Sequence, residues 1–422
     1  MTEVDPREAA PPPASESGAD GAEEQRPSKY GVKAVFGAAV GYAMDGFDLL
    51  IIGFALAAIS ATFHLSDTQA GALSTFTLVG AVLGGVIFGI LSDYLGRVRV
   101  LTWSILIFAV FTGLSADAWD YPSLLAFRLL AGIGLGGEFG IGMTLAAEAW
   151  PAKLRARATA WVANGWQAGT LLASAAAAVL IPLGGWRLLF AVGILPAVIA
   201  YLLRRRLHEP EKFTAAKARR TRTEFPVRKL FADARTTRAT IGMLVLTSVQ
   251  NFVYYGVITW LPTYLSRQTG ESFNKSIGWT AVTVVGMVIG VFVFGKLCDT
   301  IGRRPSFFVF QVGALATTLG YAQLTSSTAL LFGGLVMGAF INGAMGGFGA
   351  LLAELYPTEA RATAQNVIWN IGRGVAGFGP LLIAALAAGK GFAYAIGCLA
   401  AVYVLAMLAL LLIPERKGTE LA

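Results

Sequence analysis

The sequence predicts an all-α membrane protein whose 12 transmembrane helices form two pseudo-symmetric six-helix bundles. Two observations support this prediction. First, 55% of the 422 residues are hydrophobic and only 14% are charged, whereas soluble domains carry about a quarter charged residues. Second, one chemical pattern occurs twice, each time at the end of an apolar run. The two copies, Gly89-x-Leu-x-Asp93-x-x-Gly96-Arg97 and Gly295-x-Leu-x-Asp299-x-x-Gly302-Arg303, lie 206 residues apart.

A second pair of motifs keeps the same offset. Glu148-Ala-Trp-Pro151, followed by Arg155, matches Glu354-Leu-Tyr-Pro357, followed by Arg361, again 206 residues later. An offset that holds over two separate motifs indicates a duplicated unit. A duplicated unit built of membrane-length segments is typical of transporters.

The apolar runs are long enough to span a membrane, which takes roughly 20 residues. Hydropathy and helix breakers predict six runs in each half of the chain. We place them at 33–60, 70–92, 100–116, 122–148, 156–181 and 186–203, and at 239–265, 277–298, 306–323, 328–355, 364–387 and 391–413.

The basic residues predict the orientation. Of the 33 Lys and Arg residues, 27 fall in the two termini and in alternate loops, and the segment 204–238 alone carries 12 basic and 4 acidic residues. The positive-inside rule therefore predicts a multi-pass protein of the plasma (cytoplasmic) membrane with both termini cytoplasmic. The predicted organisation is a disordered N-terminus at 1–30, bundles at 31–203 and 239–413, a basic linker at 204–238 and a tail at 414–422.

Each part of the repeated loop has a physical use. The leading glycine allows close helix approach, the aspartate can pair with the arginine or cap the next helix, and the second glycine permits a tight turn. At these residues the chain resembles the major facilitator superfamily from about residue 30 onward, although Tyr94 and Thr300 replace the family's usual basic residue. The resemblance implies a gating role for Gly89, Asp93, Gly96, Arg97, Gly295, Asp299, Gly302, Arg303, Glu148, Arg155, Glu354 and Arg361.

Asp45 and Asp48 lie three residues apart in the first span and therefore on one helix face. Charges inside a membrane usually mark a pathway or a proton relay, although one aspartate could instead serve only as a structural partner of an arginine. The Asp45-Gly-Phe-Asp48 stretch is similar to that of the aromatic acid:proton and sialate:proton symporter branches, which implies proton coupling. Arg128, at a comparable depth, could pair with either aspartate. Glu138 follows a glycine run resembling the carboxylate and sialate branches, and it is equally suited to transport or helix packing.

Arg373 falls near the predicted midplane of the eleventh span, with no carboxylate nearby in that helix. Its planar guanidinium suits a substrate carboxylate, with Asp45 as the alternative partner. The offset places Asp45 on Asn251 and Gln167 on Arg373, so the halves differ chemically, which favours proton handling in the first half and anion binding in the second. The predicted substrate-binding residues are Arg373, Gln167, Asn164, Asn370, Asn251, Tyr254, Tyr255 and Trp166.

These residues predict a proton-coupled secondary transporter that imports a small organic acid by alternating access. Monocarboxylates such as lactate, aromatic acids and sialic acid all fit. A proton antiporter exporting a drug or metabolite, or a porter of a neutral solute such as a sugar, remains an alternative. No nucleophile–base set, phosphate loop or metal-ligand spacing points to an enzyme. We expect no cofactor, no metal and no nucleic-acid partner, contact with membrane lipids, and function as a monomer.

Overall fold

The computed structural model describes residues 27–195, 198, 201–202, 208–209, 213–215, 225–270, 273–419 and 421. The predicted disordered segment 1–30 lies almost entirely outside the described residues. Much of the predicted linker 204–238 lies outside them as well.

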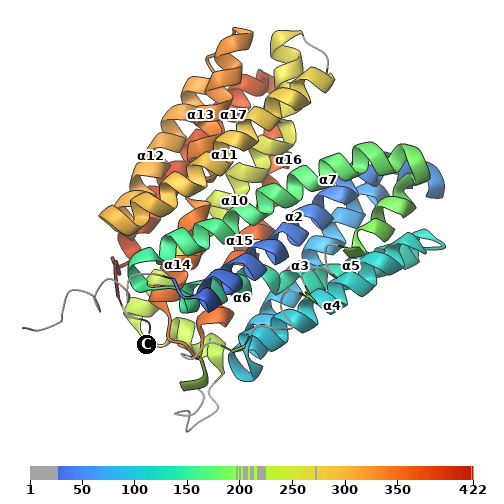
Figure 1. Cartoon of the computed structure of the whole chain (residues 1–422). Helices are drawn as coiled ribbons and strands as arrows, with labels where there is room; N and C mark the ends of the chain where they lie inside the picture. The colour runs from blue at the N-terminus through green and yellow to red at the C-terminus, as the bar shows by residue number, and fades with distance from the viewer. Residues whose placement is uncertain are drawn as a thin grey trace, which may run out of the picture.

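The first half of the chain folds into one helical bundle, coloured blue to green in Figure 1. Its elements are α2 (Lys29–Phe63), α3 (Asp67–Leu95), α4 (Arg97–Ala116), α5 (Tyr121–Gly136), α6 (Glu138–Ala149), the 3₁₀ turn η1 (Ala152–Leu154) and α7 (Arg155–Val192). Within α7, Gly184 and Gly185 leave helical geometry, at the boundary predicted between the fifth and sixth spans.

The second half forms the other bundle, coloured yellow to red in Figure 1. It contains η2 (Pro226–Phe231), α10 (Ala234–Thr269), α11 (Phe273–Ile301), α12 (Arg303–Tyr321), α13 (Ser327–Gly343), α14 (Met345–Leu355), α15 (Arg361–Ala376), α16 (Phe378–Lys390), α17 (Phe392–Ala409) and η3 (Leu410–Leu412). Three predicted spans are each divided into two helices, at Gly137, Ala344 and Gly377. The breaks in the fourth and tenth spans lie almost one repeat offset apart.

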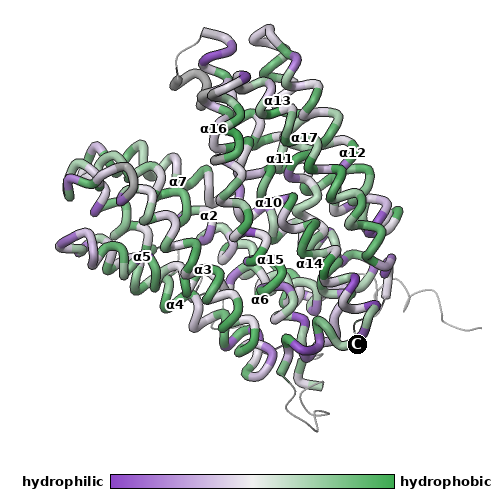
Figure 2. Tube along the Cα trace, turned by 180° about the vertical axis from the view of Figure 1, so that it is seen from behind, coloured by the Kyte–Doolittle hydropathy of each residue, from purple (hydrophilic) through white to green (hydrophobic). Residues whose placement is uncertain are grey.

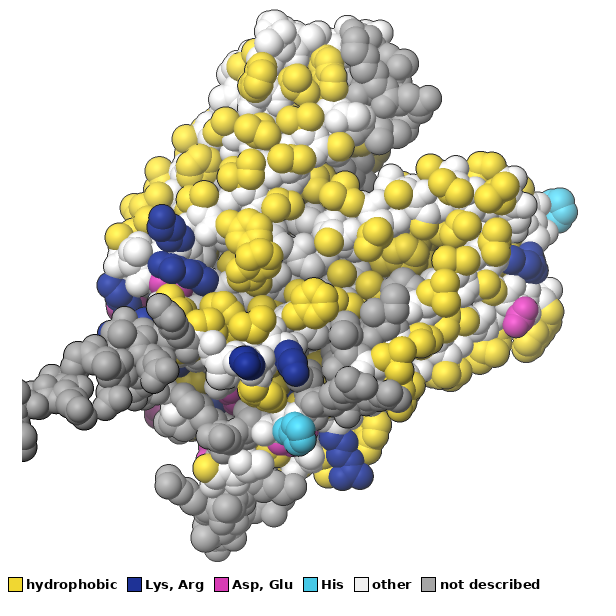
Figure 3. All heavy atoms as spheres, in the orientation of Figure 1, with side chains coloured by type: hydrophobic (Ala, Val, Ile, Leu, Met, Phe, Trp, Pro, Cys, Tyr) yellow, Lys and Arg dark blue, Asp and Glu magenta, His cyan; other side chains and the backbone are white. Residues whose placement is uncertain are grey.

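Ten helices within the described part of the chain are long and apolar enough to cross a membrane. They correspond to the predicted spans except the ninth, which is α12, and the sixth, whose start is joined to the fifth in α7 and whose end is only partly described. Large apolar side chains such as Phe36, Leu183 and Leu411 are exposed on the outside, as expected for surfaces that face lipid. Residues of high hydropathy accordingly run along both bundles in Figure 2, and hydrophobic side chains cover much of both bundles on the face seen in Figure 3.

The two repeated loops have the same backbone geometry. Gly96 separates α3 from α4 with φ of 120°, and Gly302 separates α11 from α12 with φ of 109°. Side chains with a Cβ rarely adopt these angles, so the second glycine of each motif is required for the turn. We call the end of the molecule that carries both turns the loop end. Most Lys and Arg residues visible in Figure 3 gather there.

The two bundles meet at the loop end and diverge away from it (Figures 1 and 3). Their contact brings α15 against α3 and α6, and α7 against α11 and α14. Small residues allow this approach: a Cβ on Gly89 would meet Asn366, and a Cβ on Gly295 would meet Ala160. This arrangement creates a buried space between the halves, bounded on one side by the loop-end contacts.

Candidate functional site

A cavity lies between the two halves. It is lined by Tyr42, Ala163, Trp166 and Gln167 from the first half, and by Gln250, Asn251, Tyr254, Tyr255, Asn342, Met345, Trp369 and Arg373 from the second. The space among these residues has a volume of about 330 Å³, which includes space open to solvent.

Arg373 is the only Lys or Arg among the residues that line this cavity, and its side chain is 2% exposed. Its guanidinium carbon lies 5.3 Å from the centre of the Trp166 ring, and the Tyr255 hydroxyl interacts with the same guanidinium. Its Nε donates no hydrogen bond to any residue that the structure describes. A buried guanidinium with donor capacity to spare suits a carboxylate ligand.

Aromatic side chains surround Arg373. The Trp166 indole nitrogen donates a hydrogen bond to the Tyr254 hydroxyl over 3.0 Å, and the rings of Tyr42 and Trp166 are 5.5 Å apart. Oε1 of Gln167 accepts no hydrogen bond within the described chain. A cavity that combines aromatic walls with a few polar groups and one cation is suited to a small, partly apolar anion.

Six of the predicted substrate-binding residues line the cavity, but Asn164 and Asn370 do not. Asn370 of α15 donates to the carbonyl of Gly136 over 3.1 Å, and Asn164 of α7 donates to the carbonyl of Val288 over 3.4 Å. Each of these asparagines therefore joins its own half to the backbone of the other half. This structure gives neither of them a place in the cavity wall.

Sequence reasoning did not select several lining residues, notably Tyr42, Gln250, Met345 and Trp369. Tyr42 precedes Asp45 by three residues on α2 and so shares its helix face. That spacing was the signal that could have identified it. Met345 follows the break between α13 and α14, a feature that the apolar run 328–355 does not reveal.

Asp45 and Asp48 are both fully buried, but they face different arginines. Nη1 of Arg128 lies 3.1 Å from both carboxylate oxygens of Asp48. Oδ2 of Asp45 lies 3.8 Å from Nη2 of Arg373. The first pair lies within one half, and the second joins the two halves.

Glu138 is the remaining residue predicted to take part in proton coupling. It begins α6 and is 2% exposed. Ser104 of α4 donates to its Oε1 over 3.4 Å and more closely, at 2.6 Å, to the carbonyl of Gly134. Glu138 therefore contacts a neighbouring helix of its own half and does not line the cavity.

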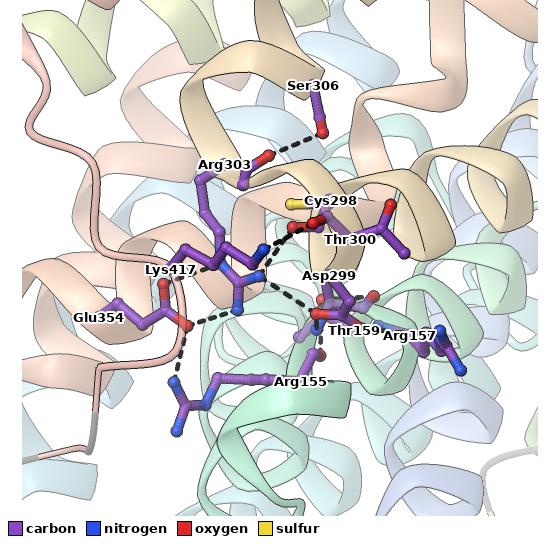
Figure 4. A network of polar contacts seen from close by, with 12 residues as sticks. Arg155, Arg157, Thr159, Cys298, Asp299, Thr300, Arg303, Ser306, Glu354 and Lys417 are labelled. Atoms are coloured by element: carbon purple, nitrogen blue, oxygen red, sulfur yellow. Dashed lines mark hydrogen bonds and ion pairs between the residues drawn. The ribbon is translucent and has the colours of Figure 1, made fainter.

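A network of buried ion pairs closes the loop end. In the second half, Arg303 contacts Asp299 at 3.2 Å and Glu354 at 2.6 Å (Figure 4). In the first half, Arg97 contacts Asp93 at 3.1 Å and Glu148 at 3.4 Å. All these residues come from the predicted gating loops, and they occupy equivalent positions in the two repeats. We call this set, with Arg155 and Arg361, the loop-end network.

The loop-end network crosses from one half to the other. Arg361 lies 2.6 Å from Glu148, and Arg155 lies 2.7 Å from Glu354. Because each glutamate is shared by one arginine of its own half and one of the other, the network ties the bundles together. Removing one partner of such a buried set is costly.

The two loop aspartates also cap helices of the opposite half. Asp93 accepts hydrogen bonds from the backbone N–H groups of Ala362 and Thr363 at the start of α15. Asp299 accepts them from Ala156 and Arg157 at the start of α7. The sequence left open an arginine pair or a cap on the next helix. The structure contains the arginine pair, and the capped helix belongs to the other repeat.

Comparison with known proteins places this architecture in a family. The Major Facilitator Superfamily model matches residues 38–279 and 269–421. The chain belongs to the major facilitator superfamily. It is therefore an integral, multi-pass membrane transporter and not an enzyme, and the predicted fold class is confirmed.

Individual members of the superfamily extend the comparison. A putative metabolite transport protein of Haemophilus influenzae is 56% identical over 93% of this chain and 98% of its own length. The cis,cis-muconate transport protein of Acinetobacter baylyi is 32% identical over 82% of this chain and 85% of its own. The solved structure of the proton:xylose symporter XylE superposes with a TM-score of 0.78 at 19% identity, over 94% of this chain and 98% of that one.

This superfamily member has two further loop-end residues that sequence reasoning missed. Glu209 accepts hydrogen bonds from the backbone N–H groups of Arg97 and Arg99, and Glu415 accepts them from those of Arg303 and Arg304. These glutamates therefore cap α4 and α12, the helices that follow the two loops. They lie 206 residues apart, so the repeat offset applied beyond the sixth and twelfth spans would have found them.

Proposed function

We propose that this transporter imports a small organic acid together with protons by alternating access. The observation that carries the proposal is the buried Arg373, which lines a cavity between the halves with aromatic and amide neighbours. The relative named as a muconate transporter supports an organic-acid substrate. Within the described part of the chain, Nε of Arg373 and Oε1 of Gln167 have no hydrogen-bond partner, so they offer one donor and one acceptor to such a ligand.

The proposed orientation places the loop end in the cytoplasm of a cell whose plasma membrane the protein spans, with both termini on that side. The basic residues at the loop end support this orientation. The closed loop-end network and the diverging opposite ends then correspond to a form that accepts substrate from outside. Lipid contacts and function as a monomer remain part of the proposal.

In the proposed cycle, the substrate carboxylate docks on Arg373 while its apolar part lies against Tyr42, Trp166 and Tyr254. Protonation of an acid on α2 offsets the negative charge that enters. The two bundles then rock about the binding site, the loop-end network opens, and both ligands leave on the cytoplasmic side.

Arg373→Ala tests the binding step. In the purified protein, lactate, benzoate, nicotinate and N-acetylneuraminate are compared by thermal shift. We expect at least one acid to raise the melting temperature of the wild type and none to raise that of Arg373→Ala, because the variant has lost the cation in the cavity. Arg267→Ala, which removes an exposed arginine near the opposite end, is the matched control and should behave like the wild type.

Uptake into proteoliposomes tests the coupling. We expect accumulation of the acid only when an inward proton gradient is imposed. Uptake that is indifferent to the gradient would overturn proton-coupled import, and efflux favoured by the gradient would instead support the exporter.

A further inference from the structure

The two aspartates of α2 have different electrostatic settings. Asp48 belongs to a closed set: Arg128 binds both its oxygens, Thr112 donates to Oδ1 over 3.0 Å, and Arg128 also donates to Thr112 and Ser115. All these side chains come from α2, α4 and α5 of one half. None of them lines the cavity, so the set can move with its half without contacting a substrate.

Asp45, in contrast, pairs with an arginine of the other half, Arg373, and the contact is longer. Its nearest carboxylate–guanidinium distance is 3.8 Å, compared with 3.1 Å for Asp48 and Arg128. Arg373, its partner, reaches the cavity wall, whereas Asp45 does not line the cavity. Arg373 therefore borders both Asp45 and the space in which a substrate would bind.

The charges of this arrangement can be counted. An ionised Asp45 and Arg373 together carry no net charge. A bound monocarboxylate brings a second negative charge to the same guanidinium, and one uncompensated charge in a buried site is expensive. Uptake of one proton by the Asp45 carboxylate restores neutrality while leaving Arg373 to the substrate.

Three tyrosines also interact with Arg373. They are Tyr42 on α2 and Tyr254 and Tyr255 on α10. Phenols are uncharged donors at neutral pH. From α7, the neighbour of Arg373 is the indole of Trp166, which does not titrate.

We propose that Asp45 alone carries the coupled proton, one for each monocarboxylate bound at Arg373, and that Asp48 with Arg128 is a positioning pair. This inference rests on the proposed function, because it assumes an organic anion in the cavity. In the step itself, the proton from the substrate side adds to a carboxylate oxygen of Asp45 and leaves again on the far side. No covalent bond of the substrate changes, and transport of the acid is electroneutral.

Proton uptake on binding provides the direct test. Calorimetric titration in buffers of different ionisation enthalpy counts the protons taken up when the strongest binder among lactate, benzoate, nicotinate and N-acetylneuraminate is added at neutral pH. We expect about one proton per anion for the wild type and none for the neutral amide of the same acid. In Asp45→Asn, we expect the acid to bind without proton uptake and at least as tightly.

The pH dependence of affinity has a definite sign. Because binding takes up a proton, wild-type affinity falls as pH rises, by up to about tenfold per pH unit once Asp45 is ionised. Asp45→Asn should show no such slope, and Asp45→Glu should restore both the slope and the proton uptake. Asp48→Asn is the matched control one helical turn away, and it should keep the slope even if its stability falls.

The outcomes separate this inference from the proposed function. Proton uptake that persists in Asp45→Asn, or that disappears in an Asp48→Asn variant which still binds acid, would overturn the assignment to Asp45. Gradient-driven uptake that survives in Asp45→Asn would overturn it as well and leave proton-coupled import intact. Failure of all four acids to bind the wild type, or uptake indifferent to the gradient, would instead overturn the proposed function itself.

Discussion

Trp166 contacts three other residues of the candidate site. Its indole nitrogen donates to Tyr254 and its ring lies beside the Arg373 guanidinium, both across the boundary between the halves, and it packs against Tyr42 of its own half. These contacts fix both the position of the cation and the shape of the cavity. Trp166 therefore contributes to binding through placement of Arg373 as well as through its own surface.

We expect Trp166→Phe to weaken acid binding by about tenfold. The variant loses a hydrogen bond worth about 1 kcal/mol and part of a cation–π contact of similar size, and a tenfold change corresponds to about 1.4 kcal/mol. Titration calorimetry on the purified protein measures the change. Trp161→Phe, at a ring that is 55% exposed on the outside of α7, is the control and should leave affinity unchanged.

Residue types and spacing predicted most of the residues that line the cavity, but they did not predict where along each helix the cavity ends. Asn370 and Arg373 are three residues apart and share a helix face, yet only Arg373 reaches the cavity. Three residues advance about 4.5 Å along a helix, and over that distance α15 passes from the cavity to its contact with the other half. Depth relative to a partner helix is set by tertiary packing, which the sequence of one helix does not contain.

At the scale of elements, close packing of α2 on α7 fixes the side of the site that belongs to the first half. A Cβ on Gly165 or Gly169 would collide with the backbone carbonyl of Ala39 or Ala43. Gly46, between the two aspartates, lies as closely against the carbonyl of Trp166. The small residues of both helices therefore set the separation between Asp45 on α2 and Trp166 on α7.

We expect Gly169→Ala to lower the melting temperature and to reduce acid binding together. The added methyl has no space against Ala43, and overpacking of this kind costs about 1–3 kcal/mol. Gly53→Ala on the partner helix α2 has no atom within 4 Å of the new methyl and is the control. A Gly169→Ala protein as stable and active as the control would show that the two helices can separate without cost.

Helix existence was predictable because apolar runs of membrane length leave the backbone few alternatives. Helix breaks were not predicted: Gly137, Ala344 and Gly377 interrupt runs that read as continuous. The backbone angles of all three residues stay in the right-handed helical region, so the breaks are slight. Such breaks depend on packing against neighbouring helices, which the hydropathy of the run does not reveal. The kink at Gly184–Gly185 was located because a proline and two glycines mark it in the sequence.

At the scale of the whole molecule, the loop-end network decides which end is closed. Glu354 is held by Arg303 from its own half and by Arg155 from the other, as Figure 4 shows. The repeat offset predicted which residues take part. The sequence did not specify that the contacts cross between halves, because an offset aligns the repeats without stating how they face each other.

We expect Glu354→Gln to populate a form in which the loop end is open. The change leaves Arg155 and Arg303 short of a carboxylate, and loss of one partner from a buried set costs about 3–5 kcal/mol. Spin labels at the exposed positions Lys153 and Lys296, with both cysteines replaced by serine, report the separation of the halves. A longer distance should appear in their distribution.

The matched control for that measurement is Glu359→Gln. Its pair with Lys229 is partly exposed, at 3.5 Å, and exposed pairs contribute little. The control should give the wild-type distance distribution. A distribution that is likewise unchanged in Glu354→Gln would show that the network does not hold the loop end closed.

The reciprocal caps at the loop end bear on how such a molecule arose. Asp93 meets the start of α15 and Asp299 meets the start of α7, so the contact of one aspartate with the opposite half is repeated at the equivalent positions by the other. That is the rule of an isologous interface between identical subunits in a twofold dimer. The Asp45–Arg373 pair breaks the rule, since the equivalent positions hold Asn251 and Gln167. Identical subunits would carry the same residue at both equivalent positions, so they would form such an acid–base pair twice or not at all. A single pair without its symmetric counterpart is open to two halves that differ in sequence within one chain.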